Sequence, residues 1–328
     1  MIRRRLIAAA PLLTAGLLAT VTRAEGTPPD APPQSADSKA AGGTPATTEV
    51  AGVMPAGEEP ADPGPRPSDG FRVDLAAALW LPRVTGTVQD GAYQYDLAPD
   101  LGLTDNAASF AGELELSWGP WHVSIEGDQF STDGTNASTG GNTFAGVTIN
   151  AGDPTATSFS YWMAGVDLGA DLYRPFADQP FALGKRKYNA ANVNSEGGYK
   201  LDFVLGGFVG FRGVGVSQQV TNLRTGLSGS VDPDWGILLA GARVGADVWL
   251  KDVFPLLRSM KVDASAGFGP AWPGGGSFTA IQASITLYPC REFGIQMGYR
   301  LQALDMESGS YQIDSKVAGM FVGGVLHF

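Results

Sequence analysis

Acidic side chains recur at every second position in two neighbouring segments of this 328-residue chain. Glu113 and Glu115 alternate with leucines, and Glu126 and Asp128 follow after the Gly119-Pro120 pair. A period of two places these carboxylates on one face of β-strands. Several carboxylates on one face are costly in a dry interior unless cations or water accompany them. The chemistry to expect is therefore ion pairing, or the passage of cations through water.

Other segments alternate in the same way and place further charges on this interior face. The face as a whole is predicted to carry Arg72, Asp74, Glu113, Glu115, Glu126, Asp128, Asp167, Asp171, Lys200, Asp202, Arg212, Arg243, Asp247, Lys261, Asp263 and Arg300. A narrow interior lined by both signs of charge predicts an ion-pair network that fills it. The excess of acids leaves a cation-preferring pore as the alternative.

The chain contains two histidines that could act in catalysis, His122 and His327. His122 shares a face with Glu126 and so could form a dyad, because a general base is often a histidine held by a carboxylate. However, the sequence contains no Gly-x-Ser-x-Gly, His-Glu-x-x-His or nucleotide-binding glycine motif. We therefore predict no enzymatic activity, no cofactor and no metal site.

The elements that must position the charges are β-strands. Apolar and polar residues alternate over 71–81, 113–118, 122–128, 158–173, 200–212, 235–250, 260–269, 277–288, 292–306 and 311–328. These segments predict an all-β protein, an antiparallel up-and-down transmembrane barrel of about ten strands. Eight or twelve strands stay open, because 174–198 or 84–97 could hide another hairpin.

Connection lengths separate the two ends of this predicted barrel. The tight turns at 119–120 and 289–291 fall on one side, and the polar stretches 82–107, 131–157 and 213–234 fall on the other. Bacterial barrels have short periplasmic turns and longer outer loops. We therefore expect these three stretches to be external loops.

The segments before the barrel predict export. Three arginines at 3–5 precede an apolar run, and Thr22-Arg23-Ala24 suits cleavage after Ala24, so 1–24 reads as a signal peptide. Residues 25–69 are rich in Pro and Ala and are expected to be a disordered periplasmic linker. The barrel domain is expected over 70–328. A net charge of −11 argues against nucleic acid as a partner, and the single cysteine, Cys290, excludes an intramolecular disulfide.

Apolar and aromatic residues mark the expected membrane contacts. The row Met320, Val322, Leu326 and Phe328 forms one face of the last segment, as a lipid-facing strand requires. Tryptophans at 80, 118, 121, 162, 235 and 249 fall near predicted strand ends, where interfacial girdles lie. Phe144 and Trp272, in predicted loops, are candidates to contact an unknown extracellular ligand.

The chain thus resembles the small outer-membrane β-barrels of bacteria, the OmpA-like and porin-like superfamily. The resemblance rests on the terminal Phe328, the alternating strands, the aromatic rows and two arginines that are expected to face inward. These are Arg243, which ends a Gly-Ala-Arg tripeptide, and Arg300, which ends a Gly-Tyr-Arg tripeptide. It implies residence in the bacterial outer membrane, contact with outer-membrane lipid, and recognition of the Phe328 strand by the barrel-assembly machinery. These signals are generic to barrels and specify no activity.

The function expected from these features is a structural or surface-interaction role for a barrel whose lumen is largely filled. One alternative is a small-solute, cation-preferring channel or porin. The other is a secreted, soluble β-sandwich that binds a ligand.

Overall fold

A computed structural model describes residues 70–138, 141–176, 181 and 190–328. Every described residue belongs to one compact unit, which begins at Pro60 and ends at Phe328. The expected signal peptide (1–24) and linker (25–69) lie outside the described residues, as do residues 177–180 and 182–189 of the ambiguous stretch 174–198. Among the described residues, no helix is long and apolar enough to cross a membrane.

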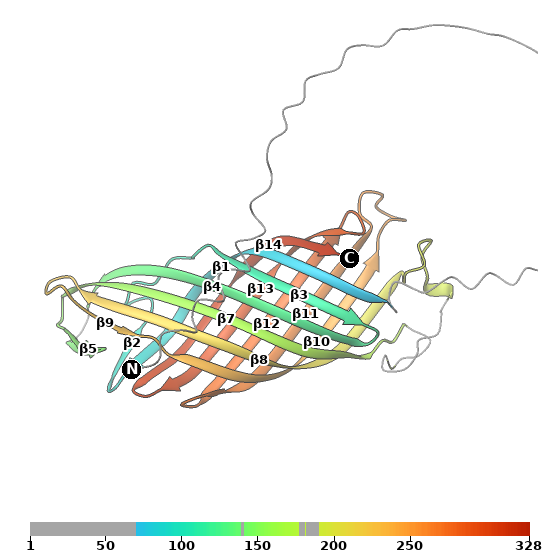
Figure 1. The fold of residues 1–328 in the computed structure, drawn as a ribbon. Coiled ribbons are helices and arrows are strands. Elements are labelled where there is room, and N and C mark those ends of the chain that lie inside the picture. The colour runs from blue at the N-terminus through green and yellow to red at the C-terminus, as the bar shows by residue number, and fades with distance from the viewer. Residues whose placement is uncertain (1–69, 139–140, 177–180, 182–189) are drawn as a thin grey trace, which may run out of the picture. The chain divides into compact units, whose positions relative to one another are not determined.

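Ten long strands in the described residues form one closed antiparallel barrel (Figure 1). They are β1 (Phe71–Asp90), β3 (Ser109–Trp118), β4 (Trp121–Ala137), β7 (Pro154–Tyr173), β8 (Leu201–Asn222), β10 (Asp234–Trp249), β11 (Ser259–Trp272), β12 (Gly276–Tyr288), β13 (Phe293–Ser308) and β14 (Tyr311–His327). Each strand pairs with its sequence neighbour, and β14 pairs with β1 to close the wall. The predicted ten-stranded barrel is confirmed, and the eight-strand, twelve-strand and β-sandwich alternatives are wrong.

Four short strands and one 3-10 turn complete the described structure. Strand β2 (Tyr93–Asp96) pairs with β1, β9 (Leu227–Val231) pairs with β8, and β5 (Asn142–Phe144) pairs with β6 (Val147–Ile149). The 3-10 turn η1 spans Ala190–Asn192. Apart from η1, these additions all lie in connections at one end of the barrel.

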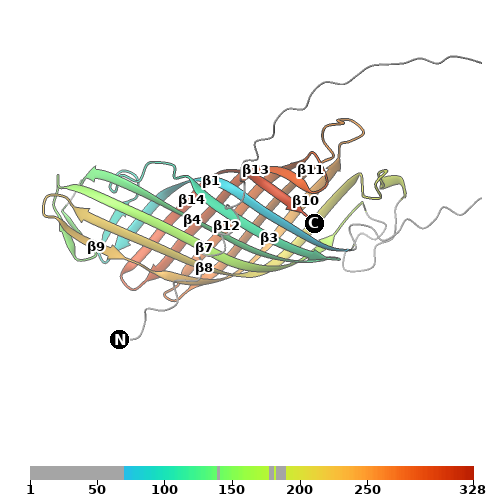
Figure 2. The same cartoon turned by 45° about the horizontal axis from the view of Figure 1, so that its top comes forward.

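We call that end the loop end, and the opposite end, where β1 begins and β14 finishes, the terminal end (Figures 1 and 2). At the terminal end, β3 turns into β4 at Gly119, whose positive φ of 57° suits a tight turn. Backbone hydrogen bonds between Val73 and Phe328, at 2.9 and 3.2 Å, seal β14 against β1 at the same end.

The strands continue well into the stretches that were expected to be external loops. Strand β1 runs on to Asp90, β4 reaches Ala137, and β8 reaches Asn222. The expectation that 82–107, 131–157 and 213–234 are simply loops is therefore wrong. The cause is the composition of these segments: Ser, Thr, Gly and Asn normally signal a loop, but here they occur within extended strands, where several of them are exposed on the outer surface.

The alternation of apolar and polar residues changes phase along the strands. Near the terminal end, β1 points Leu75 and Leu79 outward and Asp74 inward, whereas nearer the loop end it buries Val84 and Val88 inside the barrel. The same change occurs in β4, β7, β8, β13 and β14, where outward residues become Ser, Thr, Gln, Asp or Lys. As a result, the hydrophobic core lies inside the loop-end half of the lumen.

This arrangement corrects part of the expected aromatic girdle. Trp118, Trp121 and Trp162 are on the outside and well exposed, as expected of an interface. Trp80 and Trp235 are buried inside the barrel, because they occupy inward positions of β1 and β10. Phe144, a candidate for external ligand contact, is also fully buried.

Candidate functional site

The charged residues nearest the terminal end form ion pairs that cross the lumen. Arg243 on β10 lies 2.9 Å from Glu115 on β3, a strand near the opposite wall. Arg72 approaches Glu115 at 3.8 Å and Asp74 at 3.4 Å, and its own side chain is partly exposed. These contacts tie β1, β3 and β10 together across the interior.

A second group at this level consists of one pair between β1 and β14 and of further charges on β10 and β11. Asp74 pairs with Nδ1 of His327, its cross-strand neighbour. On β11, Lys261 lies 3.2 Å from Asp263, and Asp247 stands opposite Lys261 in the β10–β11 register. The lumen wall therefore alternates cation and anion at close range.

At the terminal mouth of the lumen, Arg174 follows the end of β7 and pairs with Asp171 and, at 2.5 Å, with Asp202. Lys200, which was predicted to face the interior, precedes β8 and is exposed.

Halfway along the barrel, a bidentate pair is built over glycines. Arg212 donates to both carboxylate oxygens of Asp167, at 2.7 and 2.6 Å, and also pairs with Glu126. Arg212 stands opposite Gly165, and Asp167 stands opposite Gly210. A Cβ on Gly165 would lie 2.3 Å from Arg212 Cδ, and a Cβ on Gly210 would lie 1.7 Å from Asp167 Oδ1. The glycines supply the room that two buried charged side chains need.

Arg300 on β13 spans the lumen at the next level. It donates to Asp128 on β4 at 2.8 Å and to Gln282 at 2.8 Å, while Gln302 donates to Asp128 at 3.0 Å. The guanidinium also lies over the rings of Trp80 (5.9 Å) and Phe321 (6.0 Å). Arg300 thus sits at the boundary between the charged half and the apolar half.

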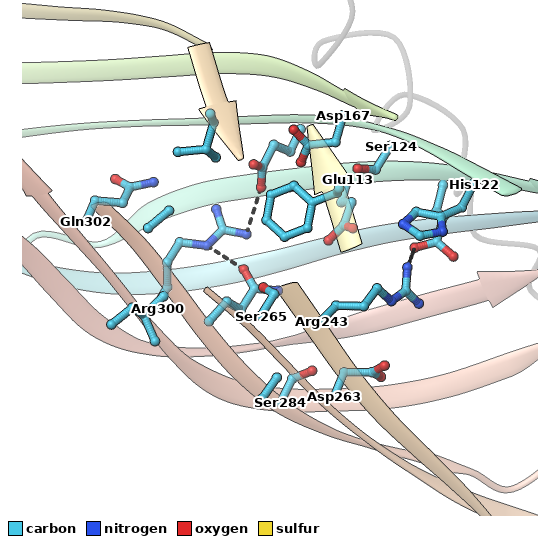
Figure 3. A pocket seen from close by; sticks show the side chains of 18 of the residues that line it. Glu113, His122, Ser124, Asp167, Arg243, Asp263, Ser265, Ser284, Arg300 and Gln302 are labelled. Carbon is cyan, nitrogen blue, oxygen red and sulfur yellow. Dashed lines mark hydrogen bonds and ion pairs between the residues drawn. The ribbon is translucent and has the colours of Figure 1, made fainter. Parts of the chain in front are cut away.

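Two adjoining cavities occupy the charged half. The deeper one, of about 150 Å³, is lined by Glu113, Ser124, Arg212, Arg300 and neighbouring polar residues (Figure 3). The other, of about 100 Å³, reaches the terminal end at Gly70. The two share the lining residues Glu115, His122, Arg243, Lys261 and Asp263. Polar cavities of this size hold several water molecules.

Above Arg300, packed aromatic side chains fill the lumen. Phe130 contacts the rings of Trp80, Phe159 and Tyr161, with centroids 6.1, 5.9 and 5.6 Å apart. All four side chains are buried, and Trp80 donates from Nε1 to the Gly319 carbonyl at 3.3 Å. Further apolar side chains continue this block to the loop end, among them Val84, Val88, Leu97, Leu101, Leu103, Phe144, Ile149, Val220, Ile237, Phe278, Leu304, Met306 and Ile313.

Hydrogen bonds across the interior hold this apolar block in place. Trp235 on β10 donates from Nε1 to the Glu307 carbonyl on β13 at 2.9 Å. The Tyr311 hydroxyl on β14 lies 2.9 Å from Oε1 of Gln218 on β8, the strand five places away around the ring. Each pair joins strands that are not neighbours in the wall, so the loop-end interior is a filled core.

The possible catalytic dyad does not form. Glu126 pairs with Arg212 and, at 3.8 Å, with Arg300, whereas the His122 ring packs over Gly169, its cross-strand neighbour. Within the described part of the chain, no three His, Cys, Asp or Glu side chains are grouped so that they could hold a metal ion. The arrangement of the lumen side chains is therefore suited to holding paired charges beside water-sized cavities.

The structure adds to the interior residues that the predicted charged face did not include. His327, Gln282 and Gln302 belong to the polar interior, and Trp80 and Phe130 belong to the apolar block. A signal was present for His327, because it has the opposite parity to the lipid-facing Leu326 and Phe328. The signal for the apolar block was the change of phase within β1 and β4.

The row that was expected to face lipid lies on the outer surface. Met320, Val322, Leu326 and Phe328 are all exposed on β14 or directly after it. Around the terminal end, Phe71 pairs with Trp118 and Trp118 pairs with Trp121, and all three side chains are exposed. An apolar outer band with an aromatic rim and a charged interior is the design of a transmembrane barrel.

The closed antiparallel sheet and its apolar outer band give this chain the architecture of a transmembrane β-barrel. Known structures with similar folds include Ail, the attachment invasion locus protein of Yersinia pestis, at 12% identity and a TM-score of 0.28, covering 79% of this chain and 97% of Ail. They also include the outer membrane protease OmpT of Escherichia coli, at 8% identity and a TM-score of 0.43, covering 80% and 98%. A third is the toluene transporter TodX of Pseudomonas putida, at 9% identity and a TM-score of 0.23, covering 79% of this chain and 90% of TodX. No protein-family model and no curated protein matches the sequence.

Proposed function

We propose that this protein is a non-conducting barrel of the bacterial outer membrane whose role is structural or surface-interactive. The observation that carries the proposal is the aromatic layer of Trp80, Phe130, Phe159 and Tyr161, which crosses the lumen above Arg300. Water and small ions need a continuous polar path, and a packed apolar layer provides none. The water-filled charged half is then a vestibule that is closed at one end.

The test is single-channel conductance of the refolded protein in a planar bilayer, after a heat-dependent shift in gel mobility has shown that the barrel is closed. We expect no steady conductance from the wild-type protein. The double variant Trp80→Ala/Phe130→Ala removes two rings of the layer and should conduct. The matched control, Trp118→Ala/Trp121→Ala, removes two exposed aromatic rings and should stay silent.

The second candidate function is a cation-preferring channel, which the acid-lined vestibule favours. If the wild-type protein gives steady, cation-selective steps, the non-conducting role is contradicted and the channel takes its place. In that case Arg243→Ala and Arg300→Ala should raise cation selectivity, because each removes a positive charge from the water-lined path. In a plugged barrel the same variants loosen the network without conferring selectivity.

In this proposal the terminal end and the 25–69 segment are periplasmic, and the loop end faces outward to meet an unidentified ligand or neighbour. The strands that run on past the apolar band, and the β1–β3, β4–β7 and β8–β10 connections at the loop end, support this orientation, although the longest connection, 174–200, is at the terminal end. The test uses single cysteines in a Cys290→Ser background. A cysteine at Ser310, in the β13–β14 turn, should react with a membrane-impermeant maleimide on intact cells. A cysteine at Arg291, in the exposed β12–β13 turn at the terminal end, should react only after the outer membrane is permeabilised.

The last strand carries the proposed contact with the barrel-assembly machinery. Met320, Val322, Leu326 and Phe328 form its exposed apolar row. Deletion of Phe328 should lower the amount of heat-modifiable barrel in the outer membrane, while detergent refolding of the purified variant stays normal. Equal losses in cells and in detergent would point to a folding defect and contradict recognition.

A further inference from the structure

The β10–β11 connection, residues 250–258, exposes apolar side chains at the terminal end. Val253, Phe254 and Leu256 are 71%, 56% and 87% exposed. Lys251, at the start of the connection, and Arg258, at its end, are charged. Figures 1 and 2 show this orange connection projecting beyond the ends of its strands. Such exposure in a soluble turn is unfavourable, because large apolar side chains gain free energy when they leave water.

The connection is continuous with the lipid-facing wall. It begins two residues after Val248 and ends two residues before Met260, and these outward residues are paired in the β10–β11 register. The wall above it carries the exposed Leu238 and Phe268. The apolar tip therefore extends a surface that already lies against hydrocarbon.

The base of the connection has the composition of a membrane interface. Trp249 lies between the Lys251 ammonium, 5.9 Å from its ring centroid, and the Arg258 guanidinium, 5.5 Å from it. Tryptophan and long basic side chains are enriched at the level of the lipid headgroups. Glu196 accepts from Lys251 at 2.8 Å and pairs with Arg258 at 2.7 Å, which draws the two ends of the connection together.

The backbone of the tip is compatible with shallow burial in lipid. The amides of Val253 and Phe254 both donate to the Leu250 carbonyl, at 2.8 and 2.7 Å, and Leu257 donates to Phe254 at 3.0 Å. Pro255 has no amide proton to satisfy. Tight internal hydrogen bonding lowers the cost of leaving water.

We infer that Val253, Phe254 and Leu256 insert into the interfacial region of the phospholipid leaflet at the terminal end. The occupant of this surface is phospholipid, and the tip acts as a lateral anchor beside the barrel. Glu196 holds the two basic ends so that the apolar tip points away from them.

The test places an NBD fluorophore on Leu256→Cys in a Cys290→Ser background. The protein is reconstituted in vesicles of phosphatidylethanolamine and phosphatidylglycerol that carry nitroxide lipids at headgroup or mid-chain depth. We expect a blue-shifted emission that the headgroup nitroxide quenches more strongly than the mid-chain nitroxide. Val322→Cys is the wall reference, with stronger mid-chain quenching, and Ser310→Cys is the aqueous reference.

Two results would overturn the inference. Emission at Leu256→Cys that matches the aqueous Ser310→Cys reference would show that the tip stays in water. A blue shift without quenching by either nitroxide would show that protein, and not lipid, covers the tip. Glu196→Gln should weaken the quenching by the headgroup nitroxide. An unchanged ratio of headgroup to mid-chain quenching would show that Glu196 does not help to hold the tip in lipid.

Discussion

The two halves of this barrel bury opposite kinds of side chain. In the terminal-end half, the outer face is apolar and the interior holds Arg212 paired with Asp167. In the loop-end half, the outer face is polar and the interior holds the rings of Trp80 and Phe130. The β1–β14 and β4–β7 pairs pass through both halves without a break in their hydrogen-bonded register.

The difference shows that the solvent outside each half determines what the inside contains. Where lipid surrounds the wall, apolar side chains make favourable contacts on the outside of the barrel. Charged side chains can then occupy the interior. Where water surrounds the wall, apolar residues gain by facing inward, as in a soluble barrel. The loop-end half is stabilised by a hydrophobic core, and the terminal-end half by ion pairs and, in the proposed membrane setting, by contact with lipid.

The largest expected effect comes from removing a ring of the apolar block. Trp80→Ala should lower the free energy of unfolding by about 4 kcal/mol, because it leaves a cavity in a packed core. Trp118→Ala, on the lipid-facing surface, leaves no cavity and should cost less than about 1 kcal/mol. Urea unfolding of both variants in the same lipid vesicles measures the difference. Equal losses would show that the loop-end interior is not a packed core.

The next effect concerns the ion pairs of the terminal-end half. Arg212→Met leaves Asp167 and Glu126 as uncompensated charges and should cost about 3 kcal/mol. Lys251→Met removes one member of a more exposed ion pair, with Glu196, and should cost no more than about 1 kcal/mol. The same unfolding assay compares the two. A small loss for Arg212→Met would mean that water in the vestibule screens the pair.

The strands and the ring closure could be predicted from the sequence, because alternation and turn chemistry are local signals. Leu75 and Leu79 gave the outward row of β1 directly. The continuation of β1 through Val84 and Val88 was missed, because Pro82 and Gly86 resemble a loop and the apolar residues move to the other parity. A search for alternation that changes phase would have found it.

The partners within the lumen could not be predicted in this way. Arg243 and Glu115 are 128 residues apart, and Arg300 and Asp128 are 172 apart. Their contacts depend on strand number, tilt and register around the closed ring, which no local pattern specifies. The sequence therefore predicts which side chains face inward and leaves open which of them meet.

A third prediction compares the two outer surfaces directly. Val322→Arg places a charge on the lipid-facing wall and should cost about 2 kcal/mol. Thr135→Arg places the same charge on the exposed outer face of β4 near the loop end and should change stability by less than about 0.5 kcal/mol. The check is unfolding in vesicles. A similar cost at both positions would place the loop-end surface in lipid as well.

The smallest expected effect is a pH dependence confined to the loop end. Asp153 is fully buried between the β5–β6 hairpin and β8. It accepts from the Asn150 amide at 2.9 Å and from the Asn222 side chain at 2.8 Å, and these bonds, with the Arg224 ion pair, hold the pKa of this carboxyl below its ordinary value.

A carboxyl whose pKa is lowered by folding adds stability that is complete above the unfolded pKa of about 4 and is lost as the pH falls through the folded pKa. Amide exchange in 142–153 should therefore accelerate, beyond its intrinsic pH dependence, only when the pH falls below about 4, while exchange in β13 changes little. Asp153→Asn should remove this pH dependence, and acceleration that persists in Asp153→Asn would assign it to another group.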